Sequence, residues 1–314
     1  MPTSVIDLVR LGNTDIRVTP LGIGTWSWGD SMVWGYGKGY AEADLKTAFD
    51  ATLASGITFF DTAEIYGWGK SERFLGKFIR ESGQKAIVAT KFFPYPWRLR
   101  KGALLKALHG SLDRLGIAQV DLYQIHFPFP PVAVETWMDG LADAVQAGLT
   151  KAVGVSNYNV EQTRRAHAAL AKRGVPLASN QVQYSLLCRD PERSGLLQTC
   201  DELGVTLIAY SPLAMGMLTG KYTPDNPPTG TRARRYNKAY LTKIQPLVGH
   251  LKEIGSTHGK TPSQVALNWV ICKGAVPIPG AKDARQAADN AAALGWWLTT
   301  DEVAALDQAS DMIH

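Results

Sequence analysis

Three chemically different polar side chains end consecutive strand-like runs of the sequence. The run ITFFD ends in Asp61, AIVATK ends in Lys91 and DLYQIH ends in His126. A phenol, Tyr66, follows Asp61 five residues later in the next loop. If these runs are neighbouring parallel strands, about 4.8 Å apart, their carboxyl ends bring the four groups to one point. Such a set could donate a proton to a reacting oxygen.

The expected roles follow from the ionisation of each group. An ammonium beside a phenol favours the phenolate, so Lys91 should make Tyr66 a stronger acid near neutral pH. Asp61 would hold a buried Lys91 in its charged form. His126 could orient a carbonyl or share in the proton transfer. Each residue alone also fits a structural role, in an ion pair or as a core histidine, but the combination on three consecutive strand ends favours a catalytic site.

Eight short apolar runs are available to position these groups, and helix-like stretches alternate with them. The runs cover 20–24, 57–61, 86–91, 121–126, 151–156, 178–182, 205–210 and 276–279. The amphipathic stretches cover 41–56, 71–82, 101–116, 131–148, 159–174, 191–204, 261–274 and 284–295. Strands joined by helical crossovers run parallel. Eight such units predict an α/β fold, a closed (β/α)8 TIM barrel, rather than an open doubly wound sheet.

Three segments lie outside the alternation. Residues 9–18 read as an N-terminal β-hairpin, and 298–310 as an extra C-terminal helix with Thr299 or Thr300 as its N-cap. Residues 223–239, rich in Pro, Gly and Arg, follow the seventh strand, where an active-site loop is expected. No linker interrupts the chain, so we expect residues 1–314 to form a single domain.

Composition excludes several classes of protein. With 314 residues, 45% hydrophobic and 19% charged, the chain is neither disordered, collagen-like nor a coiled coil. The net charge of +5 is not gathered into a basic run, so no nucleic-acid partner is expected. There is no apolar run of about 18 residues and no signal-like start, which indicates no membrane partner and a cytoplasmic location.

The cysteines give no sign of a metal or redox centre. Cys188, Cys200 and Cys272 are far apart and lack the C-x-x-C spacing of such sites. We expect three reduced thiols and no bound metal, and we make no prediction about oligomeric state.

Motifs along nearly the whole chain resemble the aldo-keto reductase superfamily. They include FFDTAEIYGWGKSE, the strand-terminal Lys in VATK, DLYQIH, GVSN, NQVQYS, IAYSPLAMGMLTGKY and IPGAKDARQAADN, in the order of the predicted strands. The pattern is closer to the bacterial, plant and potassium-channel beta-subunit branches than to vertebrate hydroxysteroid enzymes. The resemblance implies that Asp61, Tyr66, Lys91 and His126 are a catalytic tetrad.

The resemblance also implies a bound nicotinamide dinucleotide. Ser156, Asn157 and Gln181 match positions that bind the carboxamide, and Tyr210 matches the aromatic residue that stacks on the ring. The remaining positions assigned to the cofactor are Thr25, Trp26, Asp61, Ser211, Pro212, Leu213, Ala214, Gly216, Lys221, Arg232, Gly280, Lys282, Gln286 and Asn290. Lys282 and Arg285, near a helix N-terminus, could neutralise a 2′-phosphate, which favours NADPH over NADH. The alternative is a solvated basic turn, and the Arg232 region could likewise be an exposed loop.

Aromatic residues concentrate in the loops after the first four strands. This bias predicts an apolar, aromatic-walled substrate pocket above the tetrad. Its expected members are Trp28, Trp34, Trp68, Phe93 and Phe127. Phe127 stands where many relatives have Trp, which bears on substrate preference.

The sequence therefore predicts an NADPH-dependent oxidoreductase that reduces small aldehydes or ketones, with Tyr66 as the general acid. The first alternative is an NADP(H)-sensing regulatory module with little turnover, as the channel beta-subunit resemblance allows. The second is a barrel isomerase or lyase that acts on phosphorylated substrates. That alternative calls for a glycine-rich phosphate cup and no residue stacked on a nicotinamide ring, whereas Tyr210 matches such a residue.

Overall fold

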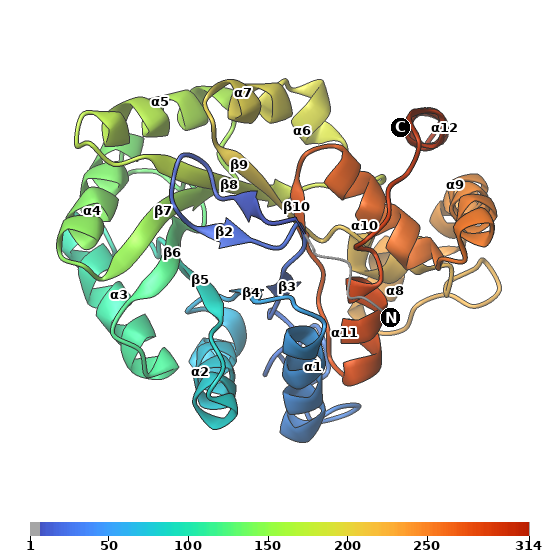
Figure 1. The fold of residues 1–314 in the computed structure, drawn as a ribbon, viewed down its shortest axis with the longest axis horizontal. Coiled ribbons are helices and arrows are strands. Elements are labelled where there is room, and N and C mark those ends of the chain that lie inside the picture. Colours follow the sequence, from blue (N-terminus) through green and yellow to red (C-terminus); the bar gives the residue numbers. More distant parts are fainter. Residues whose placement is uncertain (1–6, 314) are drawn as a thin grey trace.

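Eight parallel strands form one sheet that curls into a barrel (Figure 1). The computed structural model describes residues 7–313. Along the sheet the strands follow one another in chain order from β3 to β10. They are β3 (Ile23–Gly24), β4 (Phe59–Asp61), β5 (Ile87–Phe92), β6 (Val120–Ile125), β7 (Thr150–Ser156), β8 (Leu177–Gln183), β9 (Thr206–Tyr210) and β10 (Val276–Ile278). All eight predicted strands are present.

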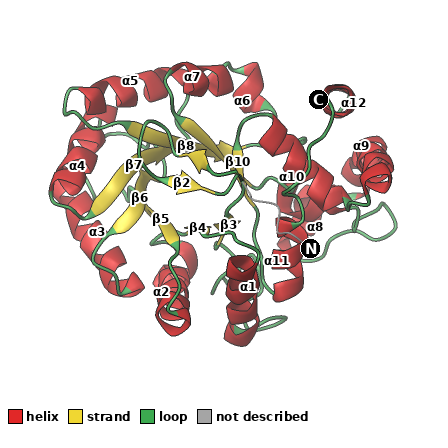
Figure 2. Ribbon diagram, in the orientation of Figure 1, coloured by secondary structure: helices red, strands yellow, loops and turns green. Residues whose placement is uncertain are grey.

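Helices surround the barrel, as the red outer ring of Figure 2 shows. Between the strands lie α1 (Glu42–Ala54), α2 (Lys70–Ser82), α3 (Lys101–Leu115), α4 (Val134–Gln146), α5 (Val160–Ala171), α6 (Asp190–Arg193), α7 (Leu196–Glu202), α8 (Thr231–Arg235), α9 (Lys238–His258) and α10 (Pro262–Cys272). Two further helices, α11 (Ala284–Ala291) and α12 (Thr300–Asp311), follow the last strand. Two short 3-10 segments, η1 (Tyr66–Gly69) and η2 (Ala214–Thr219), lie in loops after β4 and β9.

The first and last strands meet and close the barrel. Gly24 pairs with Gly280 in a parallel bridge, and the amide of Gly24 donates to the Pro279 carbonyl at 3.0 Å. A Cβ on Gly24 would lie only 2.9 Å from the Ile278 carbonyl oxygen. Glycine is therefore the residue that lets these strands approach. The predicted (β/α)8 barrel is confirmed.

An N-terminal hairpin, β1 (Val9–Arg10) and β2 (Arg17–Val18), covers the end of the barrel where the strands begin. Leu11 and Val18 of this hairpin are buried against interior residues near the strand starts, among them Phe59 and Leu122. The backbone of the hairpin is tied to β9 by a hydrogen bond from the Gly12 amide to the Thr206 hydroxyl, at 2.8 Å. The hairpin was predicted, and it leaves the opposite end of the barrel open for a site.

The region after the seventh barrel strand, β9, differs from the prediction. Residues 223–239 were expected to be a loop, but they contain α8 and the start of α9. The 21-residue α9 was not predicted. The expected helix over 191–204 divides into α6 and α7 because Gly195 adopts φ 76° between them.

The predicted C-terminal helix is α12, capped by Thr299, whose hydroxyl accepts from the Glu302 amide. It is anchored through Asp307, which accepts from the Trp269 indole at 2.9 Å and from the Lys273 ammonium at 3.0 Å. Figure 1 shows α12 next to α9 at the edge of the molecule.

Two remaining expectations concern the chain as a whole. Cys188, Cys200 and Cys272 are free thiols, as expected. No helix within residues 7–313 is both long enough and apolar enough to cross a membrane.

Candidate active site

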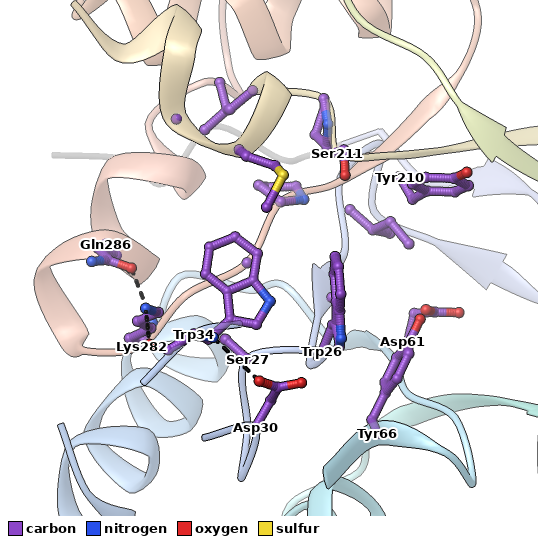
Figure 3. A pocket seen from close by; sticks show the side chains of 18 of the residues that line it. Trp26, Ser27, Asp30, Trp34, Asp61, Tyr66, Tyr210, Ser211, Lys282 and Gln286 are labelled. Atoms are coloured by element: carbon purple, nitrogen blue, oxygen red, sulfur yellow. Dashed lines mark hydrogen bonds between the residues drawn. The ribbon is translucent and has the colours of Figure 1, made fainter. Parts of the chain in front are cut away.

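A cavity of about 1130 Å³ opens at the carboxyl ends of the strands. Strand-end residues form its floor: Asp61 from β4, Ser156 from β7, Gln181 from β8 and Tyr210 from β9. Figure 3 shows Asp61 and Tyr66 at one end, Lys282 and Gln286 at the other, and the Trp26 and Trp34 rings between them. The cavity is therefore long, with proton-transfer groups and cations at opposite ends.

Lys91 links Asp61 to Tyr66 beneath the cavity floor. Its side chain is fully buried and forms an ion pair with Asp61. The Lys91 ammonium also donates to the Thr62 carbonyl at 2.9 Å and to the Tyr66 hydroxyl at 3.4 Å. The convergence expected from the strand ends is thus present in the structure.

Two amides hold the second oxygen of the Asp61 carboxylate. Nε2 of Gln181 donates to Oδ2 at 2.8 Å, and Nε2 of Gln124 donates to it at 3.1 Å. Because the other oxygen faces Lys91, both carboxylate oxygens have donors. These donors fix the orientation of the carboxylate relative to Lys91.

The acidity of Tyr66 differs from the expectation based on charge alone. Burial raises the pKa of Tyr66, and this effect exceeds the opposing effect of the Lys91 ammonium, so the pKa lies above its ordinary value. Burial lowers the pKa of Lys91, but the carboxylate of Asp61 and the phenol of Tyr66 raise it, and the net shift is upward. The tyrosine is therefore a protonated phenol beside a charged lysine.

His126 is held neutral against Tyr66. Burial, assisted by the Lys91 charge, lowers the pKa of His126 well below its ordinary value. The imidazole lies edge-on to the Tyr66 ring, with centroids 5.8 Å apart, and edge-on to Phe93 at 5.6 Å. Within residues 7–313 its buried Nδ1 has no hydrogen-bond partner. A neutral imidazole can hydrogen bond to a substrate oxygen without adding charge.

A tight turn presents Tyr66 to the cavity. Gly67 and Trp68 both adopt the left-handed conformation, with φ of 56° and 58°. A Cβ on Gly67 would lie 2.9 Å from the Gly29 carbonyl oxygen, so this turn depends on glycine. The turn leaves the Trp68 side chain 82% exposed at the cavity mouth.

An ion pair fastens the neighbouring aromatic loop to the turn that carries Tyr66. The carboxylate of Glu64 accepts from the Phe93 amide at 2.7 Å and from both terminal nitrogens of Arg98. The Arg98 guanidinium also lies over the Phe92 and Tyr95 rings, 4.9 and 5.1 Å from their centroids. These contacts hold Phe93 where it lines the cavity.

The polar set expected to bind a carboxamide is pre-assembled. Asn157, in the left-handed conformation at φ 62°, donates to the His126 carbonyl at 3.0 Å and accepts from the Tyr210 hydroxyl at 3.0 Å. The hydroxyl of Ser156 donates to the Gln181 carbonyl at 2.8 Å. All of these side chains line the cavity, and hydrogen bonds within the protein fix the places of their polar atoms.

The cationic end of the cavity is built around Trp34. The Lys282 ammonium donates to the Trp34 carbonyl at 3.1 Å and lies 4.9 Å from the Trp34 ring centroid and 4.5 Å from that of Tyr40. The Arg232 guanidinium lies 5.9 Å from the same Trp34 ring, so two cations share it. Burial, together with the Arg232 charge, lowers the pKa of Lys282 to about 8. This concentration of positive charge suits an anionic group.

The loop over 211–216, which runs into the start of η2, has an unusual backbone. Ser211, Ala214 and Met215 have positive φ, as does Gly216 at 94°. Non-glycine residues rarely adopt this conformation, and such strain gathers at ligand sites. The loop lines the cavity through Ser211, Pro212, Leu213, Met215 and Gly216.

Three buried polar atoms of cavity-lining residues lack a partner among residues 7–313. They are the Ser27 hydroxyl, the Trp34 indole nitrogen and Nδ1 of His126. Buried polar atoms are normally hydrogen-bonded, so such atoms indicate room for a polar ligand. Together with the carboxamide set and the cationic end, they fit a long dinucleotide.

Most of the predicted site residues line this one cavity. They are Trp26, Trp34, Asp61, Tyr66, Trp68, Phe93, His126, Phe127, Ser156, Asn157, Gln181, Tyr210, Ser211, Pro212, Leu213, Gly216, Lys221, Arg232, Gly280, Lys282, Gln286 and Asn290. Trp34, expected at the substrate, lines the cavity and also lies against Lys282 and Arg232. Its ring centroid is 5.5 Å from that of Trp26.

Four predicted residues do not line the cavity. Trp28, expected to contact substrate, is fully buried in the core, where it packs on Phe60 and Phe78 and its indole donates to the Ala281 carbonyl at 2.9 Å. Thr25 is buried and donates to the Asp61 carbonyl at 3.0 Å. Ala214 and Lys91 are also buried. Lys91 is connected to the cavity through its hydrogen bond to Tyr66, which lines it.

The sequence reasoning missed several cavity residues. Lining residues not assigned before include Asp30, Met32, Met215, Tyr222 and Asp289. Asp30 had a usable signal, because an Asp at the start of a glycine-rich loop often accepts backbone amides. Here its carboxylate accepts from the Val33 and Trp34 amides at 2.7 and 3.2 Å and so orders the loop. Gln124, whose amide donates to the Asp61 carboxylate, lies within the DLYQIH motif and was not predicted as a site residue.

The barrel, its cavity, the three strand-end groups and Tyr66 define a (β/α)8-barrel oxidoreductase. A family model described as "Aldo/keto reductase family" matches residues 20–311. The chain belongs to the aldo-keto reductase family, which confirms the resemblance seen in the motifs.

Individual relatives agree with this assignment. The chain is 46% identical to "Pyridoxal reductase, chloroplastic" of Arabidopsis thaliana, over 96% of this chain and 85% of the relative. It is 33% identical to an NADP(+) aldo-keto reductase of Schizosaccharomyces pombe, over 88% of this chain and 85% of the relative. Among solved structures, the glycerol dehydrogenase of Gluconobacter oxydans matches with a TM-score of 0.85 at 27% identity, over 98% of this chain and 95% of that chain. A thermostable aldo-keto reductase solved with the inhibitor epalrestat matches with a TM-score of 0.77 at 31% identity. The match covers 96% of this chain and 99% of that chain.

Proposed function

We propose that this protein is an NADPH-dependent reductase of aldehydes and ketones, with Tyr66 as the general acid. The observation that carries the proposal is the 3.4 Å contact between the Tyr66 hydroxyl and the buried Lys91 ammonium, at one end of a long cavity. NADPH, when bound, supplies the hydride that reduces the carbonyl carbon. The side chains of the protein must then supply the proton and hold the carbonyl oxygen.

Tyr66 is suited to proton donation by two opposing effects. Burial raises the pKa of Tyr66, which keeps the phenol protonated at neutral pH. The Lys91 ammonium stabilises the phenolate that remains after the proton has gone to the developing alkoxide. Asp61 keeps Lys91 charged through their buried ion pair. The neutral His126, beside the phenol, can hydrogen bond to the same oxygen and fix its position.

The residues that would hold NADPH are distributed along the cavity. Ser156, Asn157 and Gln181 would bind the carboxamide, and Tyr210 would pack on the nicotinamide ring. The pyrophosphate would lie by the loop over 211–216, near Lys221 and Arg232. Lys282, with Arg285, Gln286 and Asn290, would bind the 2′-phosphate and the adenosine side.

We infer that the substrate is a planar aromatic aldehyde of the pyridoxal class. The carbonyl of the substrate would lie at Tyr66, and its ring would lie between aromatic side chains. The ring centroid of Trp26 is 6.3 Å from that of Tyr66, and the rings of Phe93 and Phe127 flank His126. Rings of this kind favour stacked or edge-on contact with a planar ligand. The 46% identity to the plant pyridoxal reductase supports the same class.

The test is NADPH oxidation with a panel of small aldehydes, dicarbonyls, aromatic aldehydes and pyridoxal. We expect turnover with the aromatic members, and with pyridoxal a kcat/KM at least tenfold above that of an aliphatic aldehyde. NADPH binding without oxidation by any member would overturn the proposal and favour the sensor alternative. Turnover with aliphatic members only would overturn the substrate class alone.

A further inference from the structure

Gln124 is a buried amide in the middle of the barrel. It lies on β6 next to two apolar residues, Tyr123 and Ile125, and its side chain is fully buried. A buried amide is costly unless its polar atoms are hydrogen-bonded. Its nitrogen donates to Oδ2 of Asp61 at 3.1 Å, so the amide binds the carboxylate that forms the ion pair with Lys91.

The oxygen of the same amide is also engaged. Oε1 of Gln124 accepts from the Ser179 hydroxyl at 3.4 Å and from Nε2 of Gln181 at 3.5 Å. Gln181 donates through that nitrogen to Asp61 as well, at 2.8 Å. With its oxygen held in this way, the Gln124 amide can present only its nitrogen to the carboxylate.

We propose that Gln124 is a positioning residue that acts through Asp61 on the Lys91–Tyr66 pair. It never reaches the cavity. By holding Oδ2 from below, together with Gln181, it keeps Oδ1 directed at Lys91 and thereby keeps the ammonium within reach of the Tyr66 hydroxyl. This inference rests on the proposed function for its catalytic consequence, but its geometry does not depend on any substrate.

Loss of the Gln124 donor should weaken Tyr66 as an acid for two reasons that act in the same direction. With one amide donor at Oδ2 instead of two, the Asp61 carboxylate would disfavour the phenolate more strongly. The less restrained carboxylate would also draw Lys91 away from the phenol. The ionisable groups around this carboxylate are Lys91, Tyr66 and His126, with Tyr210 further along the floor. None of them can replace the lost amide, because each already contributes its own charge or proton.

The test uses Gln124→Met, which keeps an unbranched side chain of similar length. In the protein without cofactor, tetranitromethane nitrates phenolates, so the nitration of Tyr66 relative to Tyr36 measures how readily Tyr66 ionises. We expect this ratio to fall about threefold or more, as a shift of about half a pKa unit requires.

We also expect kcat of Gln124→Met to fall roughly tenfold, or about 1.4 kcal/mol in the barrier. The Kd for NADPH, read from tryptophan fluorescence, should stay within twofold of the wild-type value.

The matched control is Asn180→Leu. Asn180 is also a buried amide, on β8, but it donates to the Tyr158 carbonyl at 2.9 Å and to the Thr163 hydroxyl at 3.0 Å, away from Asp61. It should lose a comparable amount of thermal stability yet keep the wild-type nitration ratio and kcat. If Gln124→Met does not fold, Gln124→Asn replaces it, because its amide is one methylene too short to reach the carboxylate.

An unchanged nitration ratio in a folded Gln124 variant would overturn this inference. A kcat that falls only in proportion to the folded fraction of the Gln124 variant would overturn it as well. If wild-type protein oxidises no NADPH with any aldehyde, the proposed function fails, whereas the nitration ratio still decides the role of Gln124.

Discussion

The Lys91 ammonium lies 3.4 Å from the Tyr66 hydroxyl and is ion-paired to Asp61 on its other side. This places one positive charge between a group that must stay ionised and a group that must release a proton. Because burial raises the pKa of Tyr66 while Lys91 lowers it, the lysine counteracts the cost of forming a buried phenolate.

Replacement of Lys91 should damage stability and turnover together. In Lys91→Met the buried carboxylate of Asp61 loses its cation, which we expect to cost about 3–5 kcal/mol of unfolding free energy. The pKa of Tyr66 should rise further, and kcat should fall by about a hundredfold or more. Urea denaturation and NADPH oxidation measure the two effects. Full turnover in a folded Lys91→Met protein would contradict the assigned role.

Lys282 should make the preference for NADPH depend on pH. Its pKa of about 8 means that the ammonium is charged below that pH and is lost as the pH rises through it. The ratio of NADH to NADPH dissociation constants should therefore fall on passing from about pH 7 to about pH 9.5, with the midpoint above 8 because a bound phosphate raises the lysine pKa.

The control for this titration is Lys282→Arg, which stays charged at every pH in that range. Its preference for NADPH should be nearly constant with pH, whereas Lys282→Met should show a low preference throughout. A wild-type pH dependence that persists in Lys282→Met would assign the titration to another group.

The Glu64–Arg98 pair should control the substrate side of the cavity. Arg98→Met frees the loop that carries Phe93 and Tyr95, because the Glu64 carboxylate loses its bidentate partner. We expect KM for an aromatic aldehyde to rise about tenfold or more, with the NADPH Kd unchanged and about 1–3 kcal/mol of stability lost. Equal changes in KM for aromatic and aliphatic aldehydes would show that the loop does not select the ring.

Two tryptophans predicted for the substrate pocket should now behave differently. Trp28→Ala removes a fully buried ring and should cost about 3–5 kcal/mol of unfolding free energy. Trp68→Ala removes a ring that is 82% exposed and should change stability little, while raising KM for aromatic aldehydes. Thermal denaturation and steady-state kinetics separate the two. A selective KM effect in Trp28→Ala would contradict its place in the core.

The barrel and the proton-transfer set could be predicted because both depend on local pattern. Each strand is a short apolar run, and Asp61, Lys91 and His126 mark the ends of three of them. Once parallel strands are assumed, their convergence follows without knowledge of any side-chain contact.

What escaped prediction depends on packing and on distant partners. Trp28 and Trp26 are two residues apart, yet one enters the core and the other lines the cavity, and composition cannot distinguish them. The Lys91 charge alone predicted a lower pKa for Tyr66. The opposing effect of burial could not be predicted, because the extent of burial depends on tertiary packing. The helix α9 was missed because it follows a segment rich in Pro, Gly and Arg and contains Pro246, which interrupts the helical pattern, although Asn237 at its start is an N-cap signal.

The central claim is tested most directly by single-turnover reduction of an aromatic aldehyde by Tyr66→Phe. Phe keeps the ring that packs beside His126 but has no proton to give. We expect NADPH to bind with a Kd within twofold of wild type while the hydride-transfer rate falls by about a thousandfold or more. A rate within tenfold of wild type, at unchanged NADPH affinity, would contradict the role of Tyr66 as the proton donor.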